Sequence, residues 1–141
     1  MKYFKIEELT KTGTGLSNIP NVEQMQNLIY LGEHILDPLR EGLGAQITIS
    51  SGFRSPEVNK RVGGAVNSQH MAGEAADLKC GNNKSMFEWI KKNINFDQLI
   101  WEFGNDNNPQ WVHVSIKRNG NNRNEVLKAV TENGKTVYKK F

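Results

Sequence analysis

Two histidines and one aspartate in this sequence have the residue types of metal ligands. His70 and Asp77 both lie in the segment 68–77, and His113 lies far downstream in the segment 111–115. Two imidazoles and one carboxylate form a donor set that suits a catalytic zinc ion, because three protein ligands leave the fourth position for water. The three residues are therefore candidate zinc ligands.

Each candidate ligand needs an element that aims it at the others. The spacing from His70 to Asp77 does not fit one face of a helix, but it fits a loop that enters a strand over 75–79, with Gly73 allowing the backbone to bend. Alternation along that strand puts Asp77 on one face with a small alanine beside it. His113 lies in a second alternating stretch, on the face opposite two valines.

Each of these residues also has an ordinary structural interpretation. His70 is compatible with a loop histidine that has no ligand, and His113 with a hydrogen-bonded residue inside a strand. The sequence pattern alone leaves these alternatives open.

Two further residues have the chemistry to act on a substrate beside a metal. Arg54 follows an expected strand in a glycine-containing turn, where a guanidinium can stabilise an oxyanion or grip a carboxylate, although a plain surface arginine is the alternative. Glu102 ends another apolar strand and can serve as a general base and acid. Asp106 is the rival base, but it lies among turn residues where an exposed role is more natural.

The remaining pattern predicts a single α+β domain over residues 1–141, with N-terminal helices packed on a mainly antiparallel sheet. Helical spacing runs from Val22 to Leu39, with a kink or break expected near Asp37 because Pro38 follows. Capping signals predict helix starts at Asn21, Ser55 and Ser85. Strands are expected over 46–50, 75–79, 96–101 and 111–116, with hairpin signals at Asn119-Gly120 and Asn133-Gly134 and a C-terminal hairpin over about 124–140.

Composition excludes several classes of function. The net charge of +3 is mild and the basic residues are scattered, which argues against a nucleic-acid binder but suits an anionic polymer such as a bacterial wall. The single cysteine, Cys80, excludes an intramolecular disulfide. No apolar stretch is long enough for a membrane span or a signal peptide. We expect a monomer without nucleic-acid or membrane partners, made in the cytoplasm.

Three ordered motifs together resemble the M15 peptidases. They are Ser51-Gly52-Phe53-Arg54-Ser55, then Ser68-x-His70-x-x-Gly73-x-Ala75-x-Asp77, then Trp111-x-His113, within about residues 22–116. This family comprises zinc D-alanyl-D-alanine carboxypeptidases, dipeptidases and phage endolysin peptidases that cut peptidoglycan peptides, and it shares its metal fold with the hedgehog signalling domain. The resemblance implies a zinc ion bound by His70, Asp77 and His113.

The resemblance also implies roles for three other residues. Arg54 matches an arginine that stabilises the transition state or holds the substrate, and Ser68 matches a position near the substrate. Many members carry an acidic base three residues before the last histidine, where this chain has Gln110. Related members place a glutamate at the end of the preceding strand, so we expect Glu102 to be the base, with Asp106 as the alternative.

The expected function is hydrolysis of peptidoglycan stem peptides or cross-links by a zinc metallopeptidase, as a D-Ala-D-Ala carboxypeptidase or an endopeptidase. Without a signal peptide, such an enzyme fits a phage or prophage endolysin that degrades the cell wall after phage-type release, or a tail- or wall-associated hydrolase. The alternative is a catalytically inactive, zinc-stabilised binding or interaction module. That alternative predicts loss of the base or of Arg54, and both are present.

Overall fold

The computed structural model describes residues 1–141 and confirms an α+β architecture with one six-stranded sheet. The helices are α1 (Ile6–Thr10), α2 (Val22–Leu31), the π-helical η1 (Gly32–Leu36), α3 (Asp37–Leu43), α4 (Pro56–Arg61), the 3-10 helix η2 (Gln69–Ala72) and α5 (Asn83–Asn93). The strands are β1 (Thr48–Ser51), β2 (Ala75–Lys79), β3 (Gln98–Glu102), β4 (Trp111–Ser115), β5 (Glu125–Glu132) and β6 (Lys135–Lys140).

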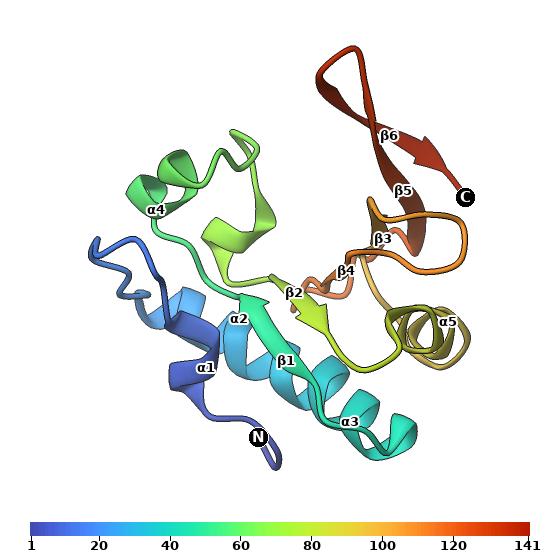
Figure 1. Ribbon diagram of the computed structural model, residues 1–141. Coiled ribbons are helices and arrows are strands. Elements are labelled where there is room, and N and C mark those ends of the chain that lie inside the picture. Colours follow the sequence, from blue (N-terminus) through green and yellow to red (C-terminus); the bar gives the residue numbers. More distant parts are fainter.

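The sheet has the strand order β1-β2-β4-β3-β5-β6, and all neighbours are antiparallel except β3 and β5 (Figure 1). The expectation that Asn119-Gly120 forms a hairpin turn was wrong. Gly120 does have a positive φ of 84°, but the segment from 116 to 124 carries the chain past β3, so β5 pairs in parallel with β3 instead of returning along β4. The closing strands are therefore only partly antiparallel.

The predicted hairpin at Asn133-Gly134 is confirmed. These two residues join β5 to β6, and both have positive φ, 52° and 75°. Positive φ at both central positions is the geometry of a type I′ turn, which matches the twist of the two strands it connects. The hairpin extends beyond the rest of the sheet in Figure 1.

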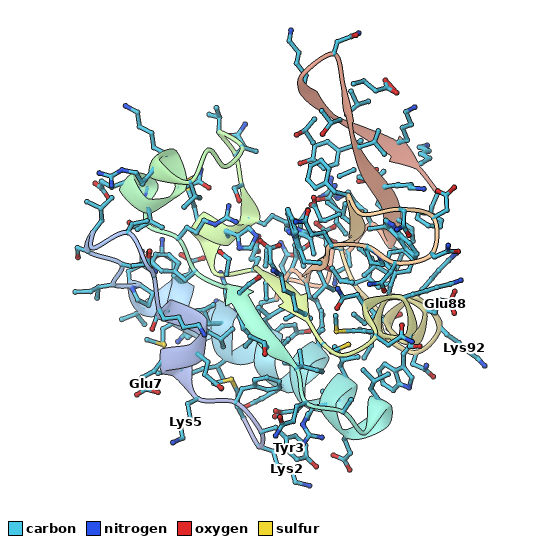
Figure 2. All side chains as sticks on the ribbon, in the orientation of Figure 1. Lys2, Tyr3, Lys5, Glu7, Glu88 and Lys92 are labelled. Carbon is cyan, nitrogen blue, oxygen red and sulfur yellow. The ribbon has the colours of Figure 1, made fainter.

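The helices and one face of the sheet enclose a single hydrophobic core. Fully buried side chains from α2, η1 and α3 form one cluster with side chains from the strands; among them are Leu28, Leu31, Ile35, Leu36, Leu39, Leu78, Leu99, Val112 and Val114. Each such side chain contributes roughly 1.5–3 kcal/mol when removed from water. Charged side chains such as Lys5, Glu7 and Lys92 point away from this core (Figure 2). None of the helices is long and apolar enough to cross a membrane.

A kink or a break was expected near Asp37, and Pro38 does not break the N-terminal helical run, although a π-helical segment interrupts the α-helical pattern there. Leu36 and Asp37 keep helical dihedral angles, and the backbone N–H of Asp37 donates to the carbonyl of Gly32. Proline has no backbone N–H, so one carbonyl of the preceding turn has no donor. The wider i→i+5 pattern of η1, just before Pro38, also leaves one carbonyl without a donor, so the helical run can contain the proline. The helical run is therefore continuous through α2, η1 and α3.

Two of the three predicted helix starts are confirmed and one was wrong. Asn21 forms the expected capping box with Gln24, and the Ser55 side chain caps α4. α5 begins earlier than expected, because Asn82 is the N-cap and its side chain accepts from the backbone N–H of Ser85 at 3.0 Å. Asparagine competes well with serine as an N-cap.

Candidate active site

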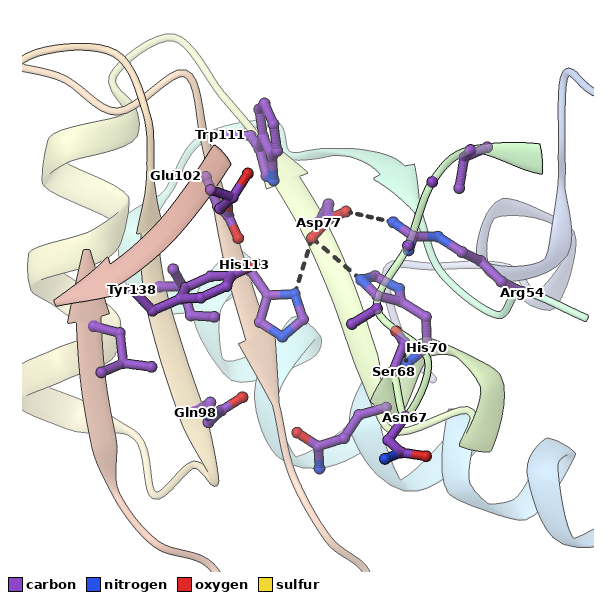
Figure 3. Close-up of a pocket in the computed structure, with 18 of the residues that line it drawn as sticks. Arg54, Asn67, Ser68, His70, Asp77, Gln98, Glu102, Trp111, His113 and Tyr138 are labelled. Carbon is purple, nitrogen blue, oxygen red and sulfur yellow. Dashed lines mark hydrogen bonds and ion pairs between the residues drawn. The ribbon is translucent and has the colours of Figure 1, made fainter. Parts of the chain in front are cut away.

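The three candidate ligands come together on the face of the sheet opposite the core helices α2, η1, α3 and α5. Asp77 of β2 and His113 of β4 are direct cross-strand partners, so their side chains lie on the same face. His70 approaches from η2, just before β2. One ligand atom from each of the three residues lies within 4.8 Å of the others, and Figure 3 shows the three side chains converging on one point.

A short turn of 3-10 helix delivers His70 to this point. The Ser68 hydroxyl caps η2 by accepting from the backbone N–H of His70 at 3.1 Å. Gly73 ends η2 with φ 75°, and a Cβ there would lie 2.5 Å from the carbonyl oxygen of Gln24. Only glycine satisfies both the left-handed backbone and the close approach to α2.

The ring of His70 is held in one orientation. Its Nδ1 lies 2.7 Å from the carbonyl oxygen of Gly52, and a carbonyl only accepts, so Nδ1 carries the proton. The other nitrogen, Nε2, lies 3.3 Å from Oδ1 of Asp77. His113 presents its Nδ1 to the same oxygen at 3.1 Å.

The surroundings of the cluster favour the ligand forms of His70 and Asp77. His70 is 2% exposed, and burial lowers its pKa, so the ring is neutral near pH 7. Burial alone would raise the pKa of Asp77, but His70 and His113 outweigh it and hold this pKa well below its usual range. The carboxylate is therefore ionised.

In these protonation states, two hydrogen-bond acceptors face each other. The lone pair of His70 Nε2 faces the charged Oδ1 of Asp77 across 3.3 Å, which is unfavourable unless a cation or a proton lies between them. Neutral imidazole nitrogens and a carboxylate oxygen are ligands that zinc prefers. The carbonyl of Gly52 supplies the outer hydrogen bond that commonly orients a metal-binding histidine. The residues present thus fit a zinc ion.

Arg54 lies beside the cluster and contacts it through one of its three side-chain hydrogen bonds. Its Nε donates to Ser51, its NH1 to Asn59 at 3.2 Å, and its NH2 to Oδ2 of Asp77 at 3.1 Å. Because a guanidinium carries five N–H donors, one donor remains on each terminal nitrogen. Arg54 therefore fixes Asp77 and keeps two donors for another group.

Glu102 lies at the end of β3 on the same face, directly opposite Trp111 of β4. It is 6% exposed, and its carboxylate makes no hydrogen bond or ion pair within the chain. Burial raises the pKa of Glu102 to about 7. Asp106, the rival base, is 92% exposed and pairs with Lys128 outside the cleft. The structure brings Glu102, and not Asp106, to the cluster.

A cleft of about 610 Å³ contains all of these groups. His70, Asp77 and His113 lie between its two walls. One wall is the loop between α4 and η2, which includes Ser68, and the other consists of β3 with the β5–β6 hairpin, which includes Tyr138. The arrangement can hold a metal ion with the Glu102 carboxyl group on one side and the Arg54 guanidinium on the other.

Sequence reasoning missed Asn59, which supports two residues of this cleft, and Tyr138, which lines it. Asn59 is 4% exposed, and it accepts from Arg54 and donates to the carbonyl of Ala65. A Cβ at Gly64 would lie 2.0 Å from the Asn59 oxygen, so the Gly63-Gly64 pair offered a weak signal of close packing. Tyr138 enters the cleft from β6, and no local pattern pointed to it.

Comparisons with known proteins agree with this geometry. The family model described as Peptidase M15 matches residues 2–115. The zinc D-Ala-D-Ala carboxypeptidase of Streptomyces albus G is 50% identical over 48 residues, which make up 33% of this chain and 19% of that protein. The chain thus spans only about a fifth of the length of this relative.

Proposed function

Because the chain belongs to the M15 peptidase family, we propose that it is a zinc metallopeptidase that hydrolyses peptide bonds in the stem peptides or cross-links of bacterial peptidoglycan. The observation that carries this proposal is the convergence of His70, Asp77 and His113 in one cleft with a buried carboxyl group, that of Glu102. The name of the Streptomyces relative supports both the metal and the substrate class.

In this proposal the protein ligands of zinc are Nε2 of His70, a carboxylate oxygen of Asp77 and Nδ1 of His113. A zinc ion bound there supplies a Lewis acid that polarises the scissile carbonyl and lowers the pKa of water. The fixed Nδ1–H of His70 keeps Nε2 aimed into the cleft. The Arg54 guanidinium holds Asp77 from its other oxygen, so this carboxylate offers Oδ1 to the metal.

Glu102 is the proposed general base and acid. Burial raises the pKa of its carboxyl group above the ordinary value, which favours acceptance of a proton from the attacking water and its later donation to the leaving amine. The lack of any hydrogen-bond partner within the chain leaves both carboxylate oxygens available for this transfer.

Arg54 and Ser68 are proposed to face the substrate. The two unused N–H donors of Arg54 can stabilise the developing oxyanion, or the terminal carboxylate of a D-Ala-D-Ala substrate. Ser68 lines the cleft, but its hydroxyl already accepts from His70. Ser68 therefore contributes to positioning His70 as well as to the surface that meets the substrate.

The place of action in this proposal is the bacterial cell wall, as for a phage endolysin. Whether the enzyme removes a terminal D-alanine or cuts inside a peptide depends on what meets the two free donors of Arg54. A terminal carboxylate there corresponds to a carboxypeptidase, and an internal carbonyl corresponds to an endopeptidase. The products distinguish the two reactions.

A catalytically inactive zinc-stabilised module is the competing proposal. Such a module has no need for a carboxyl group that faces the cleft beside the histidines without a hydrogen-bond partner in the chain. Glu102 is such a group, so the structure favours the enzyme.

The test is digestion of purified peptidoglycan followed by mass spectrometry of the released muropeptides. Wild-type protein should release D-alanine or shortened peptides, and Glu102→Gln should retain zinc but release none of them. Asp106→Asn is the matched control and should retain activity. Release of the same products by Glu102→Gln would exclude Glu102 as the base, and absence of products from the wild type would contradict the proposed function.

A further inference from the structure

The β5–β6 hairpin forms part of the cleft although it lies outside the segment that the family model matches. That segment ends at residue 115, whereas Thr136 and Tyr138 of β6 both line the cleft. Alternation along β6 places these two residues on the same face. The wall of the cleft beside Glu102 is thus built by a part of the chain to which no role has been assigned.

Strand register connects Tyr138 directly to Glu102. Glu102 of β3 is opposite Ala129 of β5, and Ala129 is opposite Tyr138 of β6. Residues directly opposite each other point to the same face of a sheet. Glu102, Ala129 and Tyr138 therefore form one row across the cleft face.

The small residue in the middle of this row leaves room for the tyrosine ring. Strands in a sheet are about 4.8 Å apart, so two strand spacings separate the backbones of Tyr138 and Glu102, roughly the reach of a tyrosine side chain plus a glutamate. Ala129 is fully buried even though it belongs to the cleft face. Figure 3 shows the Tyr138 ring extending from β6 toward Glu102 and His113.

The phenol of Tyr138 is available as a donor. The residue is 52% exposed, so the side chain is accessible from the cleft. Its pKa is raised by partial burial and then by the negative charges of Glu102 and Asp77, so the hydroxyl stays protonated near neutral pH. No hydrogen bond within the chain occupies this hydroxyl.

The hairpin that carries Tyr138 is anchored firmly to the rest of the sheet. Arg123, just before β5, donates from Nε and NH2 to the fully buried Asp97 at 3.0 and 2.7 Å. Phe141 directly follows β6. The centroid of its ring lies 5.1 Å from that of Phe87 and 5.7 Å from that of Trp101. Tyr138 therefore has a defined position relative to Glu102.

From this arrangement we propose that Tyr138 is a substrate-binding residue whose hydroxyl donates a hydrogen bond to a backbone carbonyl of the peptide, on the side of the cleft opposite Arg54. The proposal rests on the proposed peptidase function and adds a subsite to it. A peptide lying across the metal would meet the guanidinium of Arg54 on one side and the phenol of Tyr138 on the other. Tyr138 would thus help to fix the register of the scissile bond next to Glu102.

The first test is the kinetics of Tyr138→Phe on soluble stem peptides. Loss of one hydrogen bond to the substrate should lower kcat/KM by about 5- to 10-fold, mostly through a higher KM, with zinc content and melting temperature unchanged. Lys135→Ala is the matched control on the same hairpin, because Lys135 is exposed and lies on the opposite face of β6. It should keep wild-type kinetics.

The second test measures binding without turnover. In the Glu102→Gln background, adding Tyr138→Phe should raise the Kd for the same stem peptide by about 5- to 10-fold, as followed by isothermal titration calorimetry. Unchanged KM and Kd in an otherwise active enzyme would overturn the role of Tyr138 and leave the peptidase proposal standing. A wild-type protein that neither binds nor cleaves any stem peptide would overturn both.

Discussion

Nε2 of His70 lies 3.3 Å from Oδ1 of Asp77, while the opposite nitrogen of the same ring donates to a backbone carbonyl. Two acceptors therefore face each other in a buried position. A bound cation would convert this repulsion into two favourable contacts, as the proposed zinc site requires.

The zinc content of histidine variants should distinguish zinc ligands from histidines that do not bind the metal. The chain has three histidines, so His34, which is exposed and stacks on Tyr30, is a natural control. Purified wild-type protein and His34→Ala should each contain about one zinc per chain by metal analysis, and His70→Ala and His113→Ala should contain almost none. Equal zinc in all four proteins would remove the ligand assignment.

Removal of the metal should destabilise the protein. Zinc at 100 times its Kd adds about 2.7 kcal/mol of stability, and for a chain of this size each kcal/mol corresponds to about 2–4 °C in Tm. Chelation should therefore lower Tm by roughly 5–10 °C in differential scanning calorimetry, and zinc should restore it. A Tm that is indifferent to both treatments would argue against a bound metal at this site.

Loss of the carboxylate at Asp77 should lower the zinc affinity more than loss of a hydrogen-bond partner of a ligand would. Asp77→Asn removes the anionic ligand and leaves the Arg54 guanidinium without its counter-charge. We expect zinc affinity to fall by more than about 100-fold, beyond the 10- to 100-fold typical of outer-shell changes. Asp106→Asn, at a residue that is 92% exposed, should leave the affinity unchanged; competition with a fluorescent chelator measures both.

The raised pKa of Glu102 predicts a pH dependence of stability in metal-free protein. Because the folded-state pKa is about 7 and the ordinary value is 4.5, the protonated side chain contributes stability that is fully present below pH 4.5 and is lost as the pH rises through 7. The difference between the two values corresponds to roughly 3 kcal/mol. Glu102→Gln should not show this loss.

Urea unfolding of both proteins in chelator, at pH 5 and pH 8, checks this prediction. The free energy of unfolding should fall more steeply with pH in the wild type than in Glu102→Gln, and all other titrating groups cancel in the comparison. Parallel pH profiles would show that Glu102 has an ordinary pKa. Bound zinc should lower the pKa of Glu102, because a nearby cation favours the carboxylate.

Gly73 should be sensitive to a single methyl group. In Gly73→Ala the side chain would occupy a left-handed position with φ 75° and lie 2.5 Å from the carbonyl of Gln24. We expect a loss of at least about 1–3 kcal/mol of stability, together with weaker zinc binding because η2 must shift. Gly13→Ala has nothing within 4 Å and no positive φ, so it should unfold like the wild type in urea.

The sequence predicted the ligand strands well because their signals are local. β2 covers 75–79 as expected, and period-2 alternation correctly put Asp77 and His113 on the face opposite the core. The type I′ turn at Asn133-Gly134 is likewise encoded in two adjacent residues. These features depend on neighbours in the chain, so they can be read without knowing the fold.

Features that depend on distant parts of the chain were not predictable in the same way. The parallel pairing of β5 with β3 is what brings Tyr138 into line with Glu102, and no pattern near residue 138 reports it. The carbonyl that orients His70 belongs to Gly52, 18 residues earlier. The sequence led us to expect a kink or a break near Pro38, and no local pattern specified the π-helical segment that the structure has there.

The most direct test of the metal site is X-ray diffraction from crystals of the zinc-loaded protein, with data collected on both sides of the zinc absorption edge. We predict one anomalous peak, bounded by Nε2 of His70, Oδ1 of Asp77 and Nδ1 of His113. Stoichiometric zinc with its peak elsewhere in the molecule, or with no peak among these three atoms, would contradict the assignment.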